Sequence, residues 1–99
     1  MILDDISETS DAAGSIHKYI LNKMNQGVYL MSIRKTTNGF PYSVFALTID
    51  STNYNRFISN LQKVSGSIDG VTLAPHGSGE LELNGLEANT DYVLSFKKL

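Results

Sequence analysis

The sequence predicts an α+β fold: one small domain over residues 1–99, with a largely antiparallel sheet and two helices in the order α-β-β-α-β-β-β. Three observations predict it: two stretches with helical apolar spacing, one Asn-Gly hairpin signal, and short alternating runs towards the end. A length of 99 residues fits one domain, and 41% hydrophobic against 18% charged residues fits a globular chain. Residues 1–9 are expected to form a flexible acidic arm.

Residues 11–25 are expected to form the first helix. Ser10 is a suitable N-cap, and Asp11 places negative charge at the positive end of the helix dipole. The apolar residues that recur at helical spacing are Ala13, Ile16, Ile20 and Met24. Gly27 is expected to end this helix.

Residues 28–36 and 40–49 are expected to form a hairpin around Asn38-Gly39. Asn-Gly is a strong hairpin signal because a type I′ turn needs positive φ at both central residues. A two-residue loop places Tyr29 opposite Thr48. Both faces of the far end are apolar in that pairing, so we expect this hairpin to be covered on two sides.

Residues 53–64 are expected to form the second helix, closed by Gly66. Its apolar residues are Tyr54, Phe57, Ile58, Leu61 and Val64. The remaining positions are polar, as on the solvated face of an amphipathic helix. We therefore expect Phe57 and Leu61 to pack this helix against the sheet.

The remaining chain predicts three short strands, at 68–74, at 80–83 and around 92–96, joined by a loop at 75–79 and a turn at 84–90. The run Leu81-x-Leu83-x-Gly85-Leu86-Glu87-Ala88-Asn89-Thr90-Asp91-Tyr92-x-Leu94-x-Phe96 resembles the corner between the fifth and sixth strands of a fibronectin type III domain. The resemblance implies a tyrosine corner that closes a β-sandwich. Because the chain has no tryptophan and predicts a helix at 53–64, where that family is all-β, we interpret it as a local turn.

Several classes of function are excluded by composition and motif. The chain has no cysteine, which excludes disulfides, thiolate metal sites and a cysteine nucleophile. It has neither a phosphate-binding Gly-rich loop nor a Gly-x-Ser-x-Gly elbow. Its longest apolar runs have four residues, such as 44–47, and are far too short to span a bilayer. The acidic start lacks the features of a signal peptide, so we expect a cytoplasmic protein without membrane partners.

Charge is unevenly distributed along the chain. Residues 12–65 hold six basic residues and one acidic residue, whereas residues 1–11 and 66–91 hold only acidic ones. One interpretation is that these segments lie side by side in the fold and neutralise one another. The alternative is that segment 12–65, which is also rich in aromatic residues, binds nucleic acid. The candidate contacts for nucleic acid are Arg34, Lys35, Tyr42 and Arg56.

Both histidines are candidates for a site. His17 has no metal-ligating residue at helical spacing, so we expect a surface side chain, and Glu80 and Glu82 are expected to be solvated. We therefore predict no metal site and no cofactor. His76 lies in a glycine-flanked loop, where small residues allow a partner close approach. This loop supplies the first set of candidate binding residues, His76, Gly77, Ser78 and Gly79.

The sequence therefore predicts a non-enzymatic protein–protein interaction module: an inhibitor, adaptor or assembly subunit. It would act through the His76 loop, a sheet edge or the tip of the hairpin. The candidate residues at that tip are Arg34, Lys35, Phe40 and Tyr42, because arginine and aromatic side chains are common among binding hot spots. The expected partner is another protein or a second copy of the chain, with nucleic acid as the alternative. Catalysis by His76 is the least favoured hypothesis.

Overall fold

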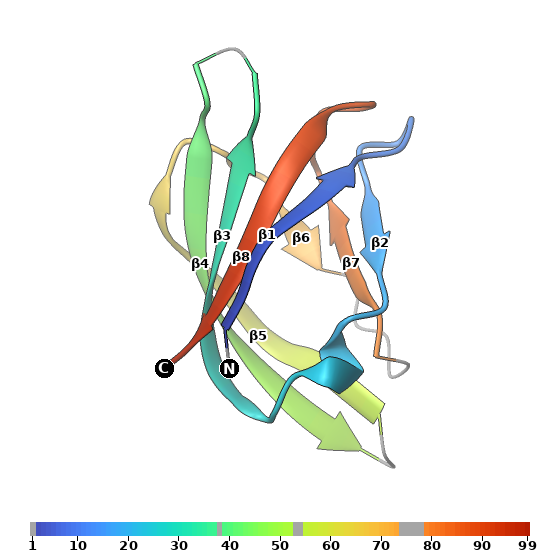
Figure 1. Cartoon of the computed structure of the whole chain (residues 1–99), viewed down its shortest axis with the longest axis vertical. Coiled ribbons are helices and arrows are strands. Elements are labelled where there is room, and N and C mark those ends of the chain that lie inside the picture. Colours follow the sequence, from blue (N-terminus) through green and yellow to red (C-terminus); the bar gives the residue numbers. More distant parts are fainter. Residues whose placement is uncertain (1, 38, 53–54, 74–78) are drawn as a thin grey trace.

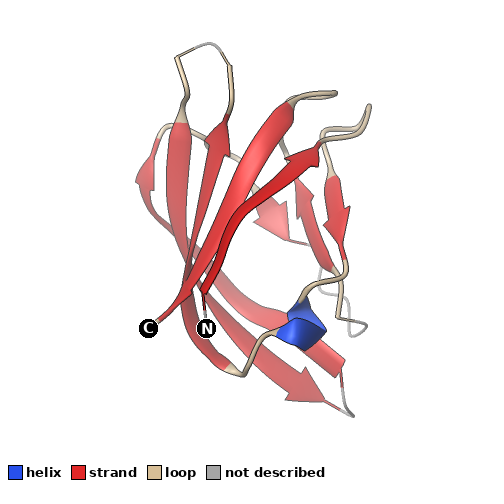
Figure 2. Cartoon of the chain, viewed as in Figure 1, coloured by secondary structure: helices blue, strands red, loops and turns tan. Residues whose placement is uncertain are grey.

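The computed structural model describes residues 2–37, 39–52, 55–73 and 79–99, and these form an almost purely β-structure (Figure 1). The strands are β1 (Ile2–Thr9), β2 (Ile16–Lys18), β3 (Gly27–Lys35), β4 (Tyr42–Thr52), β5 (Asn55–Gly66), β6 (Thr72–Leu73), β7 (Leu81–Asn84) and β8 (Asp91–Lys98). Within this part of the chain the helical structure is one 3₁₀ turn, η1 (Leu21–Lys23) (Figure 2). The predicted α+β class with two helices is therefore wrong.

Two antiparallel sheets enclose one core. The larger sheet has the order β1-β8-β3-β4-β5, and the smaller has the order β2-β7-β6. Side chains from both sheets and from η1 belong to one buried cluster, so the described chain is a single domain built as a sandwich. The buried apolar residues are Ile16, Ile20, Leu21, Met24, Tyr29, Met31, Ile33, Phe45, Leu47, Ile49, Val71, Leu81, Leu83, Tyr92, Leu94 and Phe96.

The strand order identifies the topology. Variable-type immunoglobulin sandwiches have the strand order B-E-D in one sheet and F-C-C′-C″ in the other. When β2 to β8 are lettered B, C, C′, C″, D, E and F in chain order, the orders β2-β7-β6 and β8-β3-β4-β5 are the same. In those sandwiches strand G flanks strand F. Here β1 occupies that side of β8 and pairs with it antiparallel, from Ile2 opposite Lys97 to Thr9 opposite Asp91. Residues 2–9 are thus an edge strand, where the sequence predicts a flexible acidic arm.

The first predicted helix is replaced by a turn, β2 and η1. Asp11 does not act in a helix: its carboxylate accepts hydrogen bonds from the N–H groups of Ala13 and Ser15, both at 2.9 Å. Such side-chain bonds compete with helical ones. Gly14 has φ +76°, which a right-handed helix excludes. The apolar residues at helical spacing include three that are nevertheless buried, with Ile16 on β2 against β7.

The second predicted helix is strand β5, and its misleading spacing has a specific cause. Ile58 and Leu61 are three residues apart, which would place them on opposite faces of a regular strand. The pairing with β4 shifts by one residue between them, so Ile58 lies opposite Ile49 and Leu61 opposite Leu47. This bulge at Ser59 returns both side chains to the core face, where they pack against the buried cluster.

Unlike Leu61, Phe57 does not pack against the buried core cluster. It lies opposite Asp50 on β4 and is only half-buried. Ile58, rather than Phe57, joins Leu61 against the core. The prediction that Phe57 and Leu61 pack a helix against the sheet is therefore wrong. The element is a strand, and of the two residues only Leu61 packs against the core.

The β3–β4 hairpin forms as predicted, but its pairing differs by one residue. Arg34 lies opposite Tyr42 and Tyr29 opposite Leu47, and the Lys35 N–H donates to the carbonyl of Pro41 at 2.9 Å. The loop is consequently longer than two residues. A one-residue slip changes which side chains share a face. The observed pairing places the odd-numbered apolar residues of both strands together on the core face, so the expected two-sided burial is an artefact of the wrong register.

The tyrosine corner is present. The backbone N–H of Glu87 donates to the Tyr92 hydroxyl at 3.1 Å, across the connection between β7 and β8. Tyr92 is the second residue of β8 and is buried. Because residues 55–66 are a strand, the helix that argued against a sandwich at this position is absent. The corner is therefore part of a two-sheet fold and more than a local turn.

Candidate functional site

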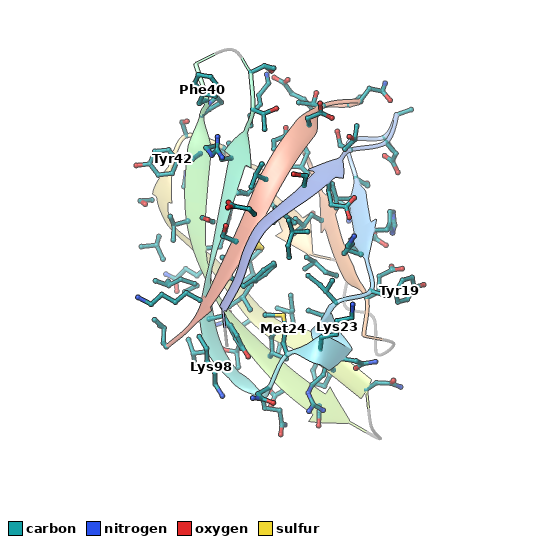
Figure 3. All side chains as sticks on the ribbon, viewed as in Figure 1. Tyr19, Lys23, Met24, Phe40, Tyr42 and Lys98 are labelled. Carbon is teal, nitrogen blue, oxygen red and sulfur yellow. The ribbon has the colours of Figure 1, made fainter. Side chains whose placement is uncertain are left out.

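Three exposed side chains gather at the projecting end of the β3–β4 hairpin, which extends beyond its neighbouring strands (Figure 1). Arg34 and Tyr42 lie opposite each other across the two strands and point away from the core. Tyr42 is 53% and Phe40 59% exposed. Figure 3 shows both rings at this end of the molecule. We call Arg34, Phe40 and Tyr42 the tip surface.

The backbone fixes the position of Phe40. Its φ is +54°, a left-handed conformation that is uncommon for a bulky residue. The Phe40 N–H donates to the Thr37 carbonyl at 3.3 Å, which closes a tight turn before β4 begins. The ring is thus held in solvent by the turn, since it lies outside the buried cluster of the core.

The tip surface continues into the outer face of the larger sheet. Partly exposed apolar residues on β3 and β4 alternate with the buried ones, as the two-residue period of a strand requires. A shallow hollow of about 210 Å³ lies in this face. Its lining residues are Leu30, Ser32, Val44, Ser95, Phe96 and Lys97.

Lys35 does not belong to the tip surface. It is the last residue of β3, faces inward and is 8% exposed. Its ammonium group lies 2.6 Å from Oε2 of Glu87, beside the tyrosine corner. The structure therefore separates Lys35 from the other three hairpin candidates and gives it a structural partner.

Removing Glu87 should destabilise the fold more than removing both charges. In Glu87→Ala the buried ammonium of Lys35 loses its partner, and we expect a loss of about 1–3 kcal/mol in the free energy of unfolding. In Lys35→Met combined with Glu87→Ala no unpaired buried charge remains, so the loss should be smaller than in the single variant. Urea denaturation of both variants measures this difference, and an equal or larger loss in the double variant would contradict it.

Of the four loop candidates the structure describes one. His76, Gly77 and Ser78 lie outside the described residues. Gly79 is buried, with φ +82°. Its carbonyl accepts from the Leu21 N–H at 3.0 Å, and its N–H donates to the Arg56 carbonyl at 3.1 Å. Gly79 thus connects η1 to β5, so its role in the described structure is to join two elements.

Three of the six basic residues in segment 12–65 pair with residues of the acidic segments. Lys18 lies 2.6 Å from Glu8, and Lys35 the same distance from Glu87. Lys63 pairs with Asp69. These pairs connect residues 12–65 to both acidic segments, which is the arrangement that the first interpretation of the charge pattern predicts.

The four nucleic-acid candidates do not form one surface. Arg34 lies opposite Tyr42, whereas Arg56 lies opposite Ser51, nearer the other end of β4. That separation is about 30 Å along the strand. The Arg56 Nε also donates to the Met24 carbonyl at 3.1 Å. Only Arg34 and Tyr42 remain together.

A second group of polar side chains lies on the outer face of the smaller sheet. His17 on β2 is directly opposite Glu82 on β7, and Glu80 immediately precedes β7. The Nδ1 atom of His17 lies 3.3 Å from Oε1 of Glu80 and 3.3 Å from Oε1 of Glu82. Imidazole nitrogen and carboxylate oxygen atoms are common metal ligands. Within the described chain, these three residues form the group whose ligand atoms lie close enough together to hold a metal ion.

The sequence does not predict this group, because its apolar spacing places His17 on a helix. On a helix the neighbours of His17 at three and four residues carry no ligating side chain, and Glu80 and Glu82 are expected only as solvated acids. The alternation Glu-x-Glu on one short strand, with a lone histidine on another strand that could face it, is the available signal. It becomes informative only once β2 and β7 are known to pair.

Glu80 also influences Tyr19, which directly follows β2 and is 68% exposed (Figure 3). The carboxylate accepts a hydrogen bond from the Tyr19 hydroxyl, and its negative charge opposes formation of the phenolate. Both effects raise the pKa of Tyr19 above its usual value, with a smaller contribution from desolvation.

The comparisons with known proteins concern the fold alone. No family model matches the chain, and no curated protein matches it. Among solved structures, the chain is similar to the Acinetobacter phage vB_ApiP_P1 tailspike protein, with a TM-score of 0.53 and 10% sequence identity. The likeness covers 100% of this chain and 21% of that chain. No helix in the described parts of the chain is long and apolar enough to cross a membrane.

Proposed function

We propose that the chain is a non-enzymatic binding domain that docks on another protein through the tip surface. The observation that carries this proposal is the exposure of Phe40 and Tyr42 at the projecting end of a hairpin, next to Arg34. Exposing neighbouring large aromatic rings to water costs free energy, which binding to a partner recovers. Tyrosine and arginine side chains are also enriched among the residues that contribute most to binding energy in protein interfaces.

The surroundings of the tip surface support a protein partner over nucleic acid. Among the basic residues proposed to contact nucleic acid, Arg34 lies beside an exposed aromatic ring. Lys35 is instead paired with Glu87. One guanidinium is too few for the multiple phosphate contacts that nucleic-acid affinity requires. The partly apolar sheet face below the tip extends the surface in a way that suits a protein contact.

The test is site-specific photo-crosslinking. A photoreactive phenylalanine analogue is placed at position 42 and, as a matched control, at Tyr19, which is equally aromatic and more exposed but lies beside the smaller sheet. Each variant is irradiated in an extract of the cells that make the protein. We expect a discrete protein adduct from position 42 that is absent from position 19, and that Phe40→Ser reduces at least tenfold.

Three results would contradict the proposal: no adduct at position 42, equal adducts at both positions, or an adduct unaffected by Phe40→Ser. A gel-shift titration with single- and double-stranded oligonucleotides examines the alternative. Binding that falls steeply with salt and depends on Arg34 would favour nucleic acid instead. An adduct with a second copy of the chain would identify the partner as the chain itself, which sedimentation velocity of wild type and Phe40→Ser then verifies.

A further inference from the structure

We propose that His17, Glu80 and Glu82 bind a divalent transition-metal cation of the zinc type on the outer face of the smaller sheet. The three residues come from two paired strands and the residue just before one of them, and one ligand atom from each lies within 4.8 Å of the others. This site is independent of the tip surface and of the function proposed for it, because it lies on the other sheet.

The spacing of the donor atoms fits a tetrahedral ion. With zinc bonds of about 2.0–2.1 Å to nitrogen and oxygen, neighbouring ligand atoms in a tetrahedron are about 3.3–3.4 Å apart. Nδ1 of His17 lies 3.3 Å from one carboxylate oxygen of Glu80 and from one of Glu82. Two of the three edges of the ligand triangle therefore already have the length that zinc requires, and the third is no longer than 4.8 Å, within reach of adjustment by rotation of a glutamate side chain.

One well-directed hydrogen bond from the histidine accounts for only one of these two contacts. A neutral imidazole carries one N–H, and one N–H forms one well-directed hydrogen bond. Here two carboxylate oxygens converge on the same nitrogen, each at 3.3 Å, longer than the usual distance for a charge-assisted bond. A cation between the three atoms would interact with both carboxylates at once.

Neighbouring side chains hold one ligand in position. The Asn84 amide donates to Oε2 of Glu82 at 3.0 Å, and Asn84 in turn accepts a hydrogen bond from the Ser15 hydroxyl. This leaves Oε1 of Glu82 directed at His17. Such outer partners orient metal ligands and are characteristic of metal sites.

Burial and donor type select the class of ion. The side chains of Glu80 and Glu82 are 11% and 17% exposed, whereas that of His17 is 46% exposed, so the group is accessible from the solvent side. Three protein ligands leave a fourth tetrahedral position for water. Calcium and magnesium prefer six or more oxygen ligands, and an imidazole nitrogen favours zinc, cobalt or nickel over either.

The test uses Zn²⁺ and Co²⁺ with the full chain. Thermal unfolding is followed with and without ZnCl₂, and the visible spectrum of Co²⁺ reports tetrahedral coordination. The informative variant is His17→Gln, because glutamine still donates a hydrogen bond to the carboxylates but is a poor ligand. Glu82→Gln removes a second ligand, and Asp50→Asn on β4 is the charge-matched control.

We expect Zn²⁺ to raise the melting temperature of wild type and Asp50→Asn, and a chelator to reverse the rise. His17→Gln and Glu82→Gln should each weaken Zn²⁺ binding at least tenfold and abolish the intense Co²⁺ absorption. Circular dichroism without metal establishes that both variants are folded. If His17→Gln does not fold, Glu82→Gln alone decides.

Three results would overturn the proposal. The first is no response of wild type to Zn²⁺ or Co²⁺ at a large excess of metal. The second is an unchanged response in the folded ligand variants, which would place the metal elsewhere. The third is an equal response to Mg²⁺, which would indicate general attraction of cations to the two carboxylates.

Discussion

Replacing Phe96 with alanine should lower the free energy of unfolding by about 3–5 kcal/mol. Phe96 is fully buried on β8, at a position paired with Met31 on β3 and with Leu3 on β1. Truncation removes its packing and leaves a cavity in the buried cluster of the core. A loss of this size is a large part of the total stability of about 5–15 kcal/mol that a small domain has.

Phe40→Ala is the matched control for Phe96→Ala. The same side chain is removed, but Phe40 is 59% exposed, so we expect a change within about 0.5 kcal/mol. Urea denaturation followed by circular dichroism measures both variants. Equal losses would show either that Phe40 packs in solution, which would contradict its exposure at the tip surface, or that Phe96 does not pack, which would contradict the core described above.

Gly14→Ala should cost about 2–6 kcal/mol, a second large effect, since strain at positive φ and overpacking each contribute about 1–3 kcal/mol. Gly14 has φ +76°, and an added Cβ would lie only 2.1 Å from the carbonyl oxygen of Leu86. The Leu86 N–H donates to the Gly14 carbonyl at 3.0 Å, so neither backbone segment moves aside freely.

Gly39→Ala separates these two contributions. Gly39 has a similar φ of +86°, but an added Cβ would meet no atom within 4 Å. We therefore expect only the conformational penalty of about 1–2 kcal/mol. The difference between the two midpoints in urea measures the steric part. A Gly14→Ala variant no less stable than Gly39→Ala would contradict the close approach of the two turns.

The sequence predicts the elements that depend on local alternation and turn residues. The β3–β4 hairpin is expected from its Asn-Gly signal, and β7 and β8 are expected because their apolar residues alternate. The two predicted helices are wrong because an apolar spacing of three or four residues is not unique to helices. In β5 the bulge at Ser59 produces this spacing within a strand, and a bulge becomes visible only through the pairing with β4.

The sites are less predictable than the strands. Arg34, Phe40 and Tyr42 can be proposed from the sequence, because residues next to a hairpin turn project into solvent. Lys35 is the neighbour of Arg34 on β3, so the two-residue period of a strand directs it to the opposite face in either register. Which of the two faces is the core is visible only in the fold. His17 and Glu82 are about 65 positions apart in the chain, and only the contact between β2 and β7 brings them together.

The pairing of β1 with β8 determines how this domain could be reconnected. Ile2 lies opposite Lys97 on the neighbouring strand, so the backbones at these two positions are about 5 Å apart. A linker of a few residues would join them without disturbing either sheet. Because the β3–β4 loop projects into solvent, a circularly permuted chain that starts at Gly39 should fold to the same sandwich. The same proximity would allow the domain to be inserted into a surface loop of another protein, because the two connections to the host chain would lie side by side.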